Sequence, residues 1–319
     1  MNQPNLGKRK MTILAWGLYL SFVILLAACS PANSNGPAVT GDNKLKVLAT
    51  TTIVGDVVSQ VGGENISLTT LLPPGSDPHS FQPTPQDAVK VAEAQLIFIN
   101  GLGLEQFLNP LIENAGSTAP VVTVSDQIQA HPGIIEPGQS QPDTRQDPHV
   151  WMDPNNVMLW VDTIEKTLTA QDSTHAQAYQ ANAAVYRKQL QDLDAWIREQ
   201  VAQIPEANRK LVTDHVIFGY FAARYGFEQV GAVIPGYSTD SQPSAQELAS
   251  LEDAIKALGV KAIFVGDTVN PSLSEQVAQD TGTRLVFIHT GSLTGPDGNA
   301  PTYLDYIRYN VSAIVNALK

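Results

Sequence analysis

Short apolar runs alternate with amphipathic stretches along most of the chain, and this alternation predicts an α/β fold. The runs 45–50 and 96–99 are continuous apolar segments of the kind found in buried strands. Strands that alternate with helices of about ten residues indicate βαβ units and mainly parallel sheets. In the first half of the chain we expect strands at 45–50, 67–72, 96–99 and 121–124 and helices at 53–61, 85–94 and 106–115.

The middle of the chain has a different pattern. Residues 156–204 contain no glycine or proline, and apolar residues such as Leu190, Leu193 and Trp196 recur at helical spacing. A single helix over residues 173–204 would be ~48 Å long at 1.5 Å per residue, which is longer than one small domain needs. We therefore expect a rigid helix that joins two lobes. The alternative is a surface helix packed on one lobe.

The α/β alternation resumes after residue 205. Here the pattern predicts strands at 210–213, 229–234, 262–265 and 285–288, and helices at 218–225, 245–258, 271–281 and 303–318. The predicted organisation is an N-terminal α/β lobe (44–155), a helical region that includes the linking helix (156–205) and a C-terminal α/β lobe (206–319). The expected fold class is two α/β lobes with mainly parallel sheets, joined by one long rigid helix. A ligand site is expected between the lobes, where strand ends converge.

The N-terminal segment is expected to lie outside this fold. A basic segment at 8–10 precedes an apolar stretch at 11–28, and small residues end that stretch directly before Cys29, the only cysteine. This order is typical of a secretory signal. The sequence Leu-Ala-Ala-Cys also resembles the bacterial lipobox, whose cysteine is acylated and begins the mature protein. We predict a signal peptide at 1–28, a lipid anchor at Cys29 and a flexible tether at 29–43; plain secretion and a buried cysteine at the end of a membrane anchor are the alternatives.

The charge of the mature chain excludes some classes of partner. Loss of the predicted signal peptide removes three basic residues and no acidic ones, so 16 basic and 31 acidic residues remain and the net charge is −15. Nucleic acids and anionic membrane surfaces bind Lys/Arg-rich patches. No nucleic-acid partner is therefore expected. The excess of acidic residues suits a protein that attracts cations. A single cysteine cannot form an intrachain disulfide, so no disulfide stabilises this fold.

Three of the six histidines have a sequence context that favours an ion site. His79 and His149 each stand in Asp-Pro-His, and His215 follows the expected strand 210–213, at the strand end where α/β folds bind ligands. Proline fixes the φ angle, so Asp-Pro-His orients its imidazole with little remaining backbone freedom. Three neutral imidazoles suit zinc and other borderline metals. A single histidine is more often structural, and His131 and His175 receive no role.

Several segments together are similar to the cluster A-I (cluster 9) solute-binding proteins, the zinc- and manganese-binding lipoproteins of ABC importers. The resemblance implies two α/β lobes bridged by one long helix, with one metal ion in the cleft. It also implies that His79 and His149 are metal ligands of the first lobe and that His215 is the first ligand of the second. Histidine at this third position is typical of zinc binders, whereas many manganese binders have glutamate. The similar segments are 77–83, 85–108, 147–154, 215–227, 247–258, 270–282 and 303–310.

The resemblance leaves the fourth ligand open. The family usually presents acids at two positions of the second lobe that are Gly266 and Gly291 in this chain. Asp267 directly follows the first of them and is the predicted fourth ligand, with His289, Asp297 or water as alternatives. A carboxylate would complete a tetrahedral shell of three nitrogens and one oxygen, which is favourable to zinc.

The predicted function is that of an extracytoplasmic solute-binding protein, lipid-anchored to the cell membrane. We expect a monomer, not an enzyme, that binds Zn²⁺, with Mn²⁺ as the second choice, and delivers it to the membrane permease of an ABC importer. A surface zinc-dependent hydrolase is one alternative, because three histidines with an open position also occur in catalytic zinc sites. No His-Glu-x-x-His or His-x-His spacing is present to favour it. A metal-binding adhesin is the other alternative.

Overall fold

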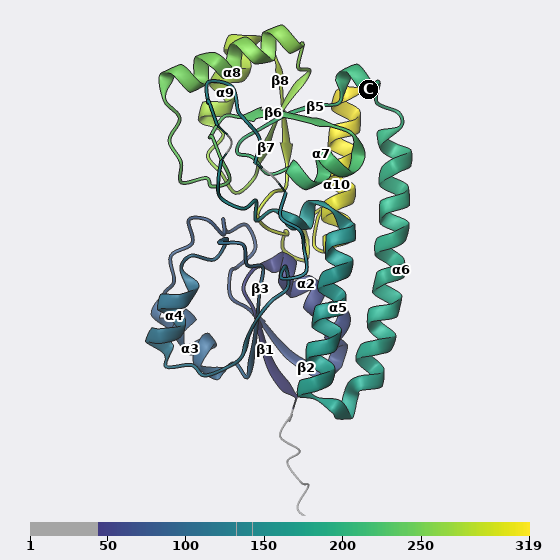
Figure 1. Cartoon of the computed structure of the whole chain (residues 1–319). Helices are drawn as coiled ribbons and strands as arrows, with labels where there is room; N and C mark the ends of the chain where they lie inside the picture. The colour runs from purple at the N-terminus through teal and green to yellow at the C-terminus, as the bar shows by residue number, and fades with distance from the viewer. Residues whose placement is uncertain (1–43, 132, 142) are drawn as a thin grey trace, which may run out of the picture. The chain divides into compact units, whose positions relative to one another are not determined.

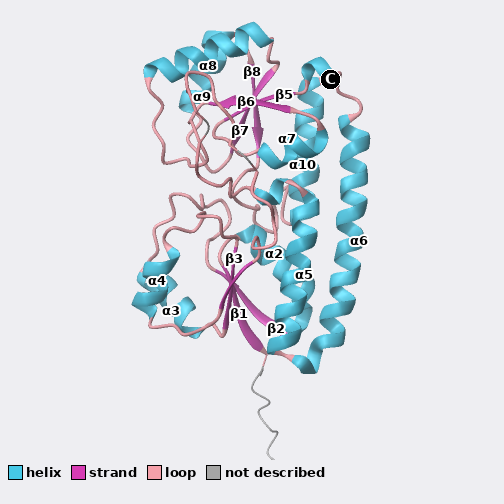
Figure 2. Cartoon of the chain, in the orientation of Figure 1, coloured by secondary structure: helices cyan, strands magenta, loops and turns pink. Residues whose placement is uncertain are grey.

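Two separate parallel sheets organise the chain, as the sequence predicts. The computed structural model describes residues 44–131, 133–141 and 143–319. Each sheet has four strands, and the two strand orders are β2-β1-β3-β4 and β6-β5-β7-β8. Figures 1 and 2 show the two sheets apart from each other. In both sheets the strand that comes first in the chain lies inside and the next lies at the edge, so one α/β arrangement occurs twice. The expected α/β class with parallel sheets is confirmed.

The expected strands and helices of both lobes are found, and their ends differ from the expected ones by at most two residues. The first lobe contains β1 (Leu45–Ala49), α2 (Thr52–Gly62), β2 (Ile66–Thr70), α3 (Pro85–Glu93), β3 (Leu96–Ile99), α4 (Leu108–Ala115) and β4 (Val121–Thr123). The second contains β5 (Lys210–Thr213), α7 (Gly219–Tyr225), β6 (Glu228–Ala232), α8 (Ala245–Leu258), β7 (Ala262–Gly266), α9 (Ser272–Thr281), β8 (Arg284–Ile288) and α10 (Tyr303–Leu318). Local signals set several of these ends: the Thr51 hydroxyl caps α2, and a Ser244–Glu247 capping box begins α8.

The middle region consists of two helices joined by a short turn. These are α5 (Pro154–Gln171) and α6 (Ala176–Val201), and a 3₁₀ turn at Ser173–His175 lies between them. The longer helix, α6, packs against α5 and α2 beside the first sheet and against α10 beside the second (Figure 1). Its 26 residues span ~39 Å at 1.5 Å per residue, less than the length expected for residues 173–204. One long helix therefore contacts both lobes.

The two lobes share one apolar core. The largest cluster of buried side chains includes residues of α2, α5, α6 and α10 and of both sheets. Hydrogen bonds cross the same boundary: Trp151 Nε1 donates to Tyr306 Oη (3.2 Å), Tyr303 Oη donates to the Trp151 carbonyl (2.7 Å), and the Tyr303 amide donates to Asp56 (2.9 Å). Because protein interiors are close-packed, the loops between the sheets stand on a continuously packed scaffold.

Two expectations concern the N-terminal segment. The predicted signal peptide, Cys29 and the tether lie outside the described residues. Within the described ranges, none of the helices combines the length and the apolar character that crossing a membrane requires.

Candidate metal site

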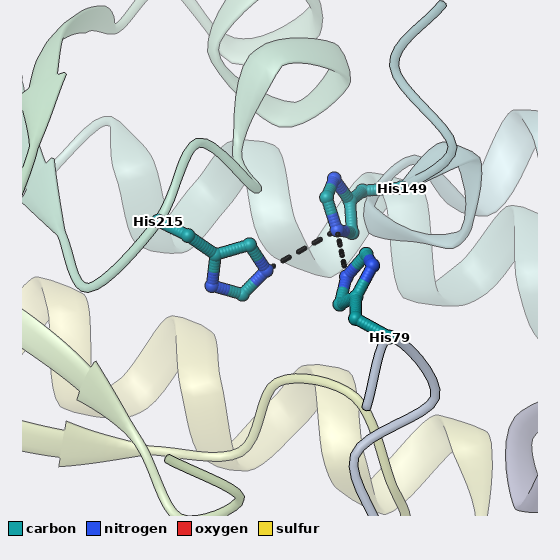
Figure 3. Close-up of side chains that lie close together, drawn as sticks. All are labelled: His79, His149 and His215. Atoms are coloured by element: carbon teal, nitrogen blue, oxygen red, sulfur yellow. Dashed lines mark hydrogen bonds between the residues drawn. The ribbon is translucent and has the colours of Figure 1, made fainter. Parts of the chain in front are cut away.

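Three loops from different parts of the chain bring His79, His149 and His215 together (Figure 3). The Nε2 atoms of His79 and His149 are 3.1 Å apart, and those of His149 and His215 are 3.2 Å apart. Among the described residues, these three form the one group of at least three potential metal-binding side chains whose ligand atoms all lie within 4.8 Å of one another. His131 and His175 are not part of it.

Buried aspartates fix which nitrogen of two rings faces the group. Asp147 Oδ1 lies 2.8 Å from His149 Nδ1, and Asp214 Oδ1 lies 2.5 Å from His215 Nδ1. An ionised carboxylate only accepts hydrogen bonds, so each Nδ1 carries the hydrogen, and when the ring is neutral its Nε2 presents a lone pair. Two such lone pairs 3.2 Å apart repel each other unless a proton or a cation lies between them. This arrangement favours a bound cation.

The backbone N–H of each histidine is held by the aspartate of its own motif. The amide of His79 donates to Asp77 (2.9 Å), that of His149 to Asp147 (2.9 Å), and that of His215 to Asp214 (2.6 Å). Sequence reasoning attributed the fixed geometry of these loops to proline and missed the aspartates. The signal was present, because an aspartate stands one or two positions before each histidine.

Burial and neighbouring charge control the protonation of the three rings. Burial lowers the pKa of His79 and of His149, and the charges of neighbouring imidazoles lower both further. Burial also acts to lower the pKa of His215, but the carboxylates of Asp214, Asp77 and Asp147 together outweigh it and the pKa is raised. Since metals bind the neutral imidazole, His79 and His149 are held in the metal-binding form.

The structure does not bring Asp267, the predicted fourth ligand, into this group. Its Oδ2 lies 2.6 Å from His289 Nδ1, and its side chain is 40% exposed. The other ring nitrogen of His289 lies 2.8 Å from Asn299 Oδ1, so both of its nitrogens are engaged outside the group. Asp297 is exposed. A ligand role for Asp267 therefore stays a prediction.

The glycines at the two positions where acids were expected lie at points of close packing. A Cβ atom on Gly266 would lie 2.1 Å from Thr290 Oγ1 and 2.9 Å from Asp214 Oδ2. A Cβ atom on Gly291 would lie 2.7 Å from Cδ of Pro78, the residue before His79. The backbone at the ends of β7 and β8 thus approaches two of the histidine loops directly.

Comparison with known proteins places this arrangement in a family. The family model of zinc-uptake complex component A (ZnuA), periplasmic, matches residues 47–317. The chain is 34% identical over 309 residues to the manganese-binding lipoprotein MntA of Halalkalibacterium halodurans, covering 97% of this chain and 99% of that protein. It is 31% identical over 302 residues to the iron-binding protein YfeA of Yersinia pestis, covering 92% of each.

Solved structures give the same result. The periplasmic zinc-binding protein TroA of Treponema pallidum matches with a TM-score of 0.78 at 27% identity, covering 86% of this chain and 99% of that one. The Mn-bound periplasmic metal-binding protein of Candidatus Liberibacter asiaticus matches with a TM-score of 0.76 at 29% identity, covering 86% and 100%. The resemblance inferred from the motifs is confirmed. The chain belongs to the ZnuA family of metal-binding solute-binding proteins of ABC transporters.

Proposed function

We propose that this protein captures one divalent metal ion, Zn²⁺ in preference to Mn²⁺, with the imidazoles of His79, His149 and His215. The observation that supports this most strongly is the convergence of three Nε2 atoms, two of which belong to rings whose Nδ1 faces a buried carboxylate. Such carboxylate–histidine pairs orient metal ligands and raise their basicity. The captured ion is then delivered to the membrane permease of an ABC importer.

The donor atoms support the choice of zinc. The relatives are named for manganese, iron or zinc, so their names do not distinguish between these metals. Imidazole nitrogen suits zinc, whereas manganese is better matched by carboxylate and other oxygen ligands. The group found here consists of nitrogen donors alone. We propose that water completes a four-coordinate zinc, with Asp267 as the alternative ligand.

The sequence and the names of the relatives together support an extracytoplasmic location. Leu-Ala-Ala-Cys ends at Cys29, and several relatives are named lipoproteins or ABC transporter substrate-binding proteins. We propose that an acylated Cys29 tethers a monomer to the outer side of the cell membrane, where it meets its permease.

Elemental analysis of protein purified without chelator tests the metal. One zinc ion per chain is expected, and metal-free protein should bind Zn²⁺ more tightly than Mn²⁺ in a competition titration. Manganese or iron at one ion per chain would contradict the choice of zinc. Asp267→Ala should leave zinc affinity unchanged if water completes the shell, and should lower it if Asp267 is a ligand. Chelator-sensitive hydrolysis of a generic ester or peptide would favour the hydrolase alternative.

A further inference from the structure

The turn after β3 has an uncommon backbone conformation. Gly101, Leu102 and Gly103 have φ angles of +90°, +55° and +80°. Leu102 is the only non-glycine residue with a positive φ in the described part of the chain. A left-handed backbone is disfavoured for a residue with a Cβ. It persists only where surrounding contacts fix it, and such positions concentrate at functional sites.

A buried glutamate fixes this turn. Glu105 Oε1 accepts hydrogen bonds from the Asn100 amide (2.7 Å) and from the Thr50 hydroxyl (2.7 Å). Its Oε2 accepts a hydrogen bond from the Gly101 amide (3.0 Å). One carboxylate therefore holds both the entry to the turn and the end of β1. Metal capture as described above assigns no task to this buried acid.

The side chain of Asn100 carries this fixation to a histidine loop. Its Nδ2 donates to the carbonyl of Pro148 (3.0 Å) and to that of Gly101 (3.0 Å). Its Oδ1 is buried and accepts no hydrogen bond from the described part of the chain. An unpaired buried acceptor lowers the stability of the folded state. The two hydrogen bonds that Nδ2 donates offset this cost.

The peptide group between Pro148 and His149 is thereby held at both ends. Its carbonyl accepts bonds from the Asn100 side chain and from the Val150 amide (2.9 Å), and its N–H donates to Asp147 (2.9 Å). Because a peptide group is planar, fixing both ends sets the plane from which the His149 side chain projects. The Nε2 atom of His149 lies close to those of both other histidines, so a rotation of this peptide plane would move the His149 imidazole away from the other two rings.

We propose that Glu105 and Asn100 are positioning residues of the metal site, which hold the Pro148–His149 peptide plane through the left-handed turn at residues 101–103. This inference rests on the proposed metal capture. The Glu105 carboxylate is hydrogen-bonded to Thr50, Asn100 and Gly101 and to none of the three imidazoles. Its effect reaches the site through one hydrogen bond, from Asn100 to the Pro148 carbonyl. Ligand geometry has to hold within ~0.5 Å for tight binding, so loss of this bond weakens capture.

Two variants and a rescue test the positioning role. Glu105→Gln replaces one acceptor oxygen with an NH₂ group that faces an N–H or O–H donor, and Asn100→Ala removes the bond to Pro148. Each should lower zinc affinity by ~10-fold to ~100-fold, as substitutions of residues behind metal ligands do. The absorption bands of Co²⁺ at saturation should change as well, because they report ligand geometry. Adding Leu102→Gly to Glu105→Gln should restore part of the affinity, since glycine adopts a positive φ freely.

A matched control separates positioning from general destabilisation. Asp56 is a partly buried acid that also accepts a backbone N–H, from Tyr303, but it lies on α2 and its hydrogen bonds to Tyr303 and Gln60 lie outside the histidine loops. Asp56→Asn should lower the unfolding temperature and leave zinc affinity and the Co²⁺ spectrum unchanged. His79→Ala reports on the site itself and should abolish tight binding.

The outcomes distinguish the two proposals. If His79→Ala loses zinc while Glu105→Gln and Asn100→Ala bind it like the unaltered protein, the positioning role is wrong and metal capture stands. If His79→Ala also binds zinc normally, both proposals are wrong. Should Glu105→Gln fail to fold, Asn100→Ala decides alone, because it removes the Pro148 bond and leaves the backbone bonds of Glu105 in place.

Discussion

Replacing Asp214 with asparagine should weaken zinc binding without a comparable loss of stability. Asp214 Oδ1 accepts the ring Nδ1–H (2.5 Å) and the backbone N–H (2.6 Å) of His215, and its Oδ2 accepts the Gly266 amide (2.5 Å). An asparagine amide has one acceptor oxygen and one NH₂ donor. In either orientation, at least one of these N–H groups faces another donor, and His215 loses the carboxylate that fixes its tautomer.

The size of the effect follows from these contacts. Substitutions of residues that orient metal ligands cost ~10-fold to ~100-fold in affinity, which is about 1.4–2.8 kcal/mol of binding free energy. Competition with a chromophoric zinc chelator at pH 7.5 measures this loss, and thermal unfolding of the metal-free protein measures stability.

A matched control exists elsewhere in the chain. Asp172 Oδ2 lies 2.6 Å from His175 Nδ1, and neither residue belongs to the histidine group. Asp172→Asn should therefore leave zinc affinity unchanged. If Asp214→Asn and Asp172→Asn lower affinity equally, or if Asp214→Asn affects only the unfolding temperature, the assigned role of Asp214 is wrong.

Three further predictions address other parts of the chain. Gly291→Ala should lower zinc affinity, because the added Cβ would lie 2.7 Å from Pro78 and displace the His79 loop. Gly295→Ala is the control and should leave zinc affinity unchanged, because no atom lies within 4 Å of a Cβ at that position. Equal affinities of the two variants in a zinc titration would refute this prediction. Burial raises the pKa of Glu136 to about 7, so the folded protein favours the protonated acid and loses stability as the pH rises from about 4.5 through 7. Thermal unfolding between pH 5 and pH 8 should therefore show a smaller loss for Glu136→Gln than for the unaltered protein, and parallel curves would argue against this role of burial. Cys29→Ala should release the protein from membranes or block its processing, and continued processing with membrane attachment would exclude acylation at Cys29.

Much of the fold could be predicted because the apolar pattern is local. The run Leu96–Ile99 is a strand in the structure with the bounds expected from the sequence, and so is Lys210–Thr213. The long middle helix was placed less well, since its first turn is a 3₁₀ turn at Ser173–His175. Apolar spacing alone does not separate an α-helical turn from a 3₁₀ turn.

The residues of the site could be predicted where short sequence motifs contain them. His79 and His149 were identified because each stands in Asp-Pro-His, and His215 was identified because it follows the predicted strand 210–213. The partner of Asp267 was not predictable, because His289 lies 22 residues away and the pair forms only when the ends of β7 and β8 lie side by side. The link from Asn100 to Pro148 spans 48 residues and likewise exists only in the folded chain.

The most direct test of metal capture is a zinc titration of metal-free protein with single alanine substitutions at five histidines. His79→Ala, His149→Ala and His215→Ala should each lose affinity by several orders of magnitude, because each removes one of three converging nitrogens. His131→Ala and His175→Ala, which alter residues outside the group, should bind one zinc ion per chain like the unaltered protein. Equal behaviour of all five variants, or tight binding that survives loss of any of the three converging imidazoles, would contradict the assignment of this site.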